Sequence, residues 1–71
     1  MIVYEIENME TREEVYVSSH TEADMKIKLK EKGFVDVGEM FLAGHNAKGH
    51  EIIAMEARFM PIGHLKHVTD L

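Results

Sequence analysis

The chain is 71 residues long and contains no cysteine, so one small hydrophobic core must hold its fold together. A core of this size supplies roughly 3–5 kcal/mol, and the missing cysteines exclude disulfide cross-links as a further source of stability. We therefore expect a single domain over residues 1–71 that gains stability from self-association or from a bound metal. The same absence excludes thiol catalysis and zinc sites with cysteine ligands.

The N-terminal part of the chain has the pattern of two strands. Residues 2–7 alternate between apolar side chains on one face and glutamates on the other, and residues 15–17 are again β-branched or aromatic. The polar segment between them is a connection, but it lacks the Asn-Gly or Asp-Gly pair that would define its turn type. An antiparallel hairpin is therefore predicted, with its acidic side chains on a solvated face.

Residues 19–33 fit either a strand or a helix. Met25, Ile27 and Leu29 alternate with lysines, which is the period of a strand. Three signals favour a helix instead. The segment begins with residues typical of a helix N-cap, it has acidic residues four positions before lysines, and Gly33 is typical of a residue that ends a helix. Two pairs of residues could form this N-terminal cap: Ser19 with Glu22, or Thr21 with Asp24. We predict a helix whose buried stripe is broad and includes Met25, Leu29, Ala23 and Ile27.

The C-terminal half is predicted to form a second hairpin. Residues 34–42 are apolar and β-compatible, residues 43–50 are a loop by their two glycines and asparagine, and residues 51–60 are a strand. Pro61 ends this strand because proline cannot donate to a ladder. Apolar residues then recur at every third position, which suits a short helix or a docked tail. The predicted fold is α+β: a small antiparallel sheet of two hairpins with one helix packed on one face (β-β-α-β-β) and a short C-terminal helix or tail.

The strand over residues 51–60 is apolar on both of its faces. One face includes Ile53 and Met55, and the opposite face begins with Ile52 and Ala54. A single helix covers only one face of a sheet, so the other face must be polar or be covered by the tail or by another copy. We therefore expect a homodimer, or a docking surface around residues 52–60.

The net charge of -5 is unevenly distributed along the chain. Residues 1–24 hold seven acids and one base, whereas residues 25–32 hold four lysines and one acid. The acidic balance disfavours binding to nucleic-acid backbones, and the lysines are divided between two flanks of the predicted helix. A protein partner with a basic surface is the predicted ligand of the acidic hairpin. The predicted contact residues are Glu5, Glu7, Glu13, Glu14, Ile52, Ala54 and Arg58.

Four histidines in the C-terminal half are the candidate metal ligands: His45, His50, His64 and His67. Neutral imidazole is a common metal ligand, and the last two histidines are spaced for one face of a helix. No H-E-x-x-H arrangement accompanies them. A small-ligand or metal-binding protein is therefore the alternative function.

No sequence motif indicates catalysis. The chain has neither a G-x-S-x-G elbow nor a phosphate-binding G-x-x-x-x-G-K-[ST] loop, so a small hydrolase or nuclease is only a third possibility. No apolar run reaches the about 18 residues that a membrane span needs, and no basic segment leads into an apolar leader. We expect a cytosolic, noncatalytic protein-interaction module that needs no cofactor. Its expected role is that of a small acidic regulator or inhibitor, of the kind that phages or mobile elements encode.

Overall fold

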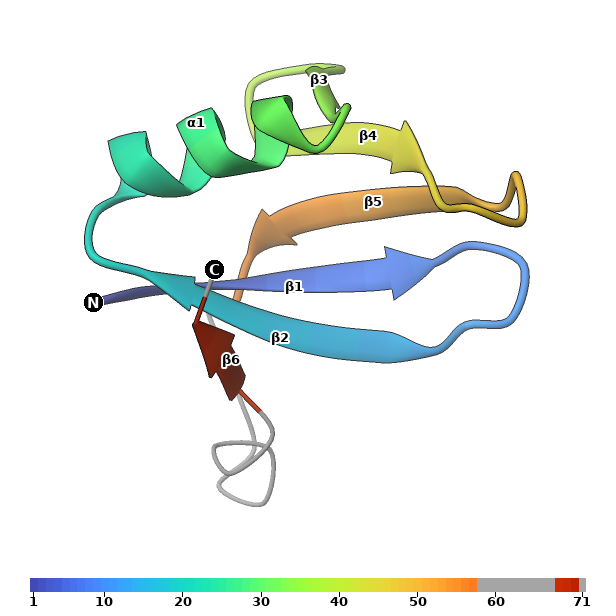
Figure 1. The fold of residues 1–71 in the computed structure, drawn as a ribbon, viewed down its shortest axis with the longest axis horizontal. Coiled ribbons are helices and arrows are strands. Elements are labelled where there is room, and N and C mark those ends of the chain that lie inside the picture. Colours follow the sequence, from blue (N-terminus) through green and yellow to red (C-terminus); the bar gives the residue numbers. More distant parts are fainter. Residues whose placement is uncertain (58–67, 71) are drawn as a thin grey trace.

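The computed structural model describes residues 1–57 and 68–70, and it shows one sheet with one helix packed on it. The elements along the chain are β1 (Ile2–Asn8), β2 (Glu14–Ser19), α1 (Glu22–Glu31), β3 (Val35–Asp36), β4 (Phe41–His45), β5 (Glu51–Glu56) and β6 (Val68–Asp70). The strands lie in the order β3-β4-β5-β1-β2-β6 (Figure 1). The predicted α+β class, with one helix on a small and mainly antiparallel sheet, is confirmed.

Two antiparallel hairpins make up the middle of the sheet, as the sequence predicts. β1 pairs with β2 and β4 pairs with β5, and the antiparallel β1–β5 pair joins the two hairpins. Two short strands extend the sheet at its edges, β3 antiparallel to β4 and β6 parallel to β2. Residues 68–70 are therefore a strand docked on β2, which excludes a helix over these three residues. The rest of the predicted C-terminal helix or tail lies outside the described residues.

The core lies between α1 and the sheet face that α1 covers. Residues paired across neighbouring strands point to the same face, so the register assigns each side chain to a face. Tyr4 is paired with Val17, and Leu42 is paired with Ala54. These residues join side chains from α1 and from the segment after it in one buried cluster: Tyr4, Val17, Met25, Leu29, Phe34, Leu42 and Ala54.

Hydrogen bonds cap both ends of α1. Thr21 is the N-cap residue, and its hydroxyl oxygen accepts a hydrogen bond from the backbone N–H of Asp24 at 3.1 Å. At the other end, the N–H groups of Gly33 and Phe34 donate to carbonyls of the last turn in the paired pattern of a Schellman motif. Gly33 has φ = 97°, a conformation that glycine adopts without steric cost. The predicted helix is thus confirmed, with Thr21 rather than Ser19 as its cap.

The buried stripe of α1 is narrower than predicted. Met25 and Leu29 are fully buried, whereas Ile27 is 57% exposed and Ala23 is also exposed. Residues four positions apart share a helix face, so Met25 and Leu29 meet the sheet together. Ile27 lies about half a turn away from both and therefore points to solvent.

Replacing Thr21 with alanine is expected to lower the free energy of unfolding by about 1 kcal/mol, because a backbone N–H in the first turn loses its acceptor. Urea unfolding followed by circular dichroism measures this loss. The Thr21→Ser variant keeps the hydroxyl and is expected to remain close to the original chain. An equal loss in both variants would show that the cap does not stabilise α1.

The second hairpin has different bounds from those predicted. Residues 43–45 belong to β4 and not to the loop, and β5 ends at Glu56. Gly44 lies inside a strand, where a Cβ atom would meet the Phe34 side chain at 3.5 Å. Glycines usually mark turns, which is why the sequence predicts a loop here, but the pairing of Gly44 with Ile52 of β5 places it inside the ladder. The connection between β4 and β5 is therefore shorter than the sequence suggests.

Candidate functional site

The sheet face opposite α1, here called the far face, presents clustered acidic side chains. Glu7 of β1 is paired with Glu14 of β2, and Glu5 lies two residues along β1 on the same face. Carboxylate oxygens of these three glutamates all lie within 4.8 Å of one another. The Arg12 Nε atom lies 3.3 Å from Glu7 Oε2 and offsets part of this charge. Three carboxylates at this spacing make this end of the far face strongly negative.

The other half of the far face is apolar. It is formed by β4 and β5, where Phe41 is paired with Met55 and Ala43 with Ile53. Met55 is 41% exposed. The register between β1 and β5 places Met55 beside Glu5, so the apolar half and the acidic half adjoin. Within the described part of the chain α1 is the one helix, and it lies on the opposite face.

The outer part of the far face, along β2, is buried. Tyr16 and Ser18 lie on this face, and both are largely inaccessible to solvent. The Tyr16 hydroxyl donates a hydrogen bond to Glu14 Oε2 at 3.3 Å. Burial raises the pKa of Tyr16, and the neighbouring carboxylates of Glu5 and Glu14 raise it further. Among the side chains whose burial the structure describes, the accessible part of the far face therefore consists of Glu14 and of side chains from β1, β5 and β4.

The structure brings the predicted acidic contact residues together. Glu5, Glu7 and Glu14 lie on the far face, and Glu13 is exposed in the adjoining β1–β2 loop. The alternation of β1 was sufficient to find Glu5 and Glu7. Their clustering with Glu14 depends on the hairpin register, which the sequence left open because the loop carries no defined turn signal.

The apolar contact residues predicted on β5 lie on the wrong face for docking. Ala54 is fully buried under α1, and Ile52 is half-buried against the core. The prediction that Ala54 touches a partner does not hold, because α1 and the sheet already enclose its side chain. Ile53 and Met55 occupy the accessible face of this strand instead. Arg58 lies outside the described residues.

Of the four predicted histidine ligands, the structure describes His45 and His50. His45 is exposed at the end of β4, and His50 is half-buried in the β4–β5 connection. Among the described residues, the one group of three potential metal ligands is the far-face cluster of Glu5, Glu7 and Glu14. Neither His45 nor His50 belongs to it. His64 and His67 lie outside the described residues.

Both ring nitrogens of His50 have protein partners. The Asn8 side-chain oxygen accepts backbone hydrogen bonds from Glu10 and Thr11, which leaves the Asn8 amide nitrogen to face His50 Nδ1 at 3.2 Å. Nδ1 therefore accepts a hydrogen bond, and Nε2 carries the proton towards Glu10 Oε2 at 3.2 Å. These contacts join the two hairpin loops. They indicate a structural role for His50.

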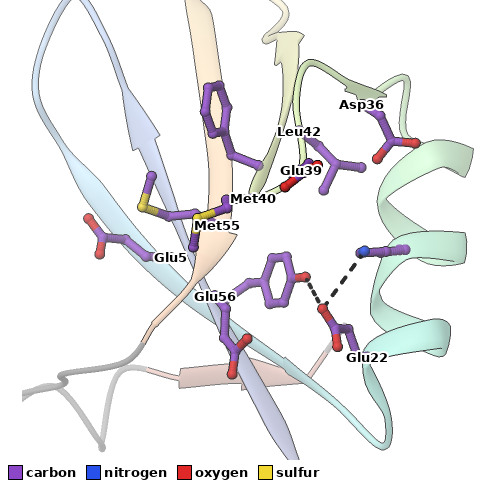
Figure 2. Close-up of a pocket in the computed structure, with 11 residues that line it drawn as sticks. Glu5, Glu22, Asp36, Glu39, Met40, Leu42, Met55 and Glu56 are labelled. Atoms are coloured by element: carbon purple, nitrogen blue, oxygen red, sulfur yellow. Dashed lines mark hydrogen bonds and ion pairs between the residues drawn. The ribbon is translucent and has the colours of Figure 1, made fainter.

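A cavity of about 620 Å³ lies between α1 and the ends of β1, β4 and β5 (Figure 2). The hydroxyl of buried Tyr4 donates to Glu22 Oε1 at 3.3 Å, and Lys26 Nζ lies 3.8 Å from the same oxygen. Burial, followed by the charge and hydrogen bond of Glu22, raises the pKa of Tyr4 to about 12. Sequence reasoning missed this cavity because its walls come from four separated segments that carry no common motif.

Comparison with known proteins adds no family or activity to this geometry. No helix in the described part of the chain is long and apolar enough to span a membrane. No family model matches the chain, and no curated protein or solved structure matches it either.

Proposed function

We propose that the chain is a noncatalytic protein-interaction module that binds its partner through the far face. One observation carries this proposal: three clustered glutamates adjoin exposed and half-buried apolar side chains on one sheet face. Protein interfaces typically combine an apolar centre with polar and charged surroundings. The partner that fits presents apolar side chains beside lysines or arginines.

The acidic half of the far face supports a role as a regulator or inhibitor. Opposite charges steer two proteins together and disfavour wrong partners. A small acidic domain that covers a basic surface would block that surface for its other ligands, including nucleic acids. We propose this blocking role, in the cytosol, as the function of the chain.

The test begins with affinity capture from a lysate of the source organism, after which the captured protein is produced separately and its affinity measured by calorimetry. The double variant Glu14→Gln/Met55→Ser removes one charge and one exposed apolar side chain from the far face. Its affinity is expected to fall roughly tenfold at low salt, and part of the loss should disappear at high salt.

The matched control is Glu31→Gln/Ile27→Ser, which makes the same two kinds of change on exposed positions of α1. This control is expected to bind as tightly as the original chain. Equal losses in the two double variants would show that the far face is not the interface.

Self-association is a second proposal for the same surface. The exposed side chain of Met55 would bring the apolar halves of two copies together, whereas the acidic halves would repel each other. Sedimentation velocity distinguishes these cases. A dimer that Met55→Ser disrupts would support the predicted homodimer, and a monomer across concentrations would exclude it.

A further inference from the structure

The cavity beside α1 is a second candidate site, and it shares only its edge, at Met55 and its neighbours, with the far face. Its volume of about 620 Å³ lies within the range of sites for small molecules, about 300–1,000 Å³. Its apolar lining comes from Tyr4, Met40, Phe41, Leu42 and Met55. Apolar walls with a few converging polar groups are the usual character of a small-molecule site.

Acidic side chains outnumber basic ones around the cavity. Four carboxylates line its α1 side, from Glu22, Asp36, Glu39 and Glu56, against the single ammonium of Lys26. Lys26 already pairs with Glu22, and Asp36 pairs with Lys30 at 2.9 Å. Glu39 and Glu56 have no ion pair or hydrogen bond with any described residue. The cavity therefore offers two carboxylates that no cation among the described residues neutralises.

The rim of the cavity leaves apolar surface in water. Met40 is 60% exposed and Met55 is 41% exposed, and both line the cavity (Figure 2). Methionine side chains are flexible and polarisable, so they adapt to ligands of different shape. Covering these side chains would remove apolar area from water, which favours a ligand that has an apolar body as well as a charge.

We propose that the cavity binds a small organic cation, an amine or a guanidine carried on an apolar body. Met40 and Met55 cover the body, while Glu39 and Glu56 pair with the charge. An anion is disfavoured by the excess of carboxylates, and a bare metal ion would gain nothing from the apolar walls. This site shares Met55 with the far face, but a small cation would occupy it without any protein partner.

The test compares two ligands of nearly the same shape, 4-phenylbutylguanidinium and the neutral 4-phenylbutylurea. Calorimetry on the purified chain is expected to show that the guanidinium compound binds roughly tenfold more tightly, because only it pairs with the free carboxylates. NMR signals of the Met40 and Met55 methyl groups are expected to shift during the same titration. Equal affinity for the two compounds, or no shift at these methyl groups, would overturn the proposal.

Two double variants test the carboxylates. Glu39→Gln/Glu56→Gln is expected to abolish the preference for the cation over the urea. The control Glu13→Gln/Glu31→Gln changes the net charge equally at exposed positions that do not line the cavity, and is expected to keep the preference. A preference that survives in the first variant would contradict the assignment. Circular dichroism confirms that each variant is folded.

A peptide with the sequence Leu-Arg-Leu, blocked at both ends, distinguishes a free cation from an arginine of a protein. The small guanidinium compound is expected to bind at least as tightly as the peptide. Binding of the peptide alone would overturn the small-molecule site and would assign the cavity to a protein partner. Since no captured partner enters these measurements, their outcome is independent of the far-face test.

Discussion

Replacing Leu29 with alanine is expected to destabilise the fold by about 2–5 kcal/mol, the range found for buried leucines. Leu29 is fully buried, and it packs in the cluster that joins α1 to both hairpins. A domain of this size has roughly 3–5 kcal/mol in total, so the variant should be largely unfolded at room temperature. Circular dichroism and urea unfolding measure the effect.

The matched control for this variant lies on the same helix. Ile27→Ala removes a similar aliphatic side chain, but Ile27 is 57% exposed, so the free energy of unfolding should change by no more than about 0.5 kcal/mol. The contrast also tests the helix itself. Met25, Ile27 and Leu29 would all face one side if this segment were a strand, and the two variants would then be equally destabilised.

Ionisation of the Tyr4 hydroxyl is expected to lower the free energy of unfolding at alkaline pH. Its pKa is raised in the folded chain from 10.0 to about 12 by burial and by Glu22, so the folded state holds the phenol proton more tightly than the unfolded state does. The corresponding stabilisation of about 2–3 kcal/mol is complete below pH 10 and is lost as the pH rises towards 12. Urea unfolding at a series of pH values measures this loss.

The Tyr4→Phe variant isolates the contribution of this phenol. Every other titratable group remains in the variant, so the difference between the two chains reports Tyr4 alone. The variant should lose less stability than the original chain between pH 10 and 12. The chain has two tyrosines and no tryptophan, so a phenolate absorbance titration follows the same event directly. Parallel stability curves for the two chains would contradict the burial of the Tyr4 hydroxyl.

Much of the fold could be predicted from local patterns. The alternation of residues 2–7 located β1, and the signals at Thr21 and Gly33 located the two ends of α1. These features depend on backbone geometry over a few residues, so a single sequence contains them. The loop predicted at Gly44 is wrong because glycines usually mark turns, and no local pattern records that Gly44 pairs with Ile52 of β5.

The candidate sites were less predictable than the fold. On β5, Ile52 and Ile53 are equally apolar, and only the pairing with β1 shows which of them faces α1. A shift of the register by one residue would exchange their roles. The cavity beside α1 has the same origin, because Glu22 and Glu56 meet there only after the sheet has formed.

The central claim is that the far face is the protein-binding surface, and methyl NMR with the captured partner tests it most directly. Isoleucine and methionine methyl groups serve as probes on both sides of the sheet. The account predicts that the signals of Ile53 and Met55 shift on binding, while those of Ile27 and Ile52 do not. Shifts confined to Ile27, on the solvent side of α1, would contradict it.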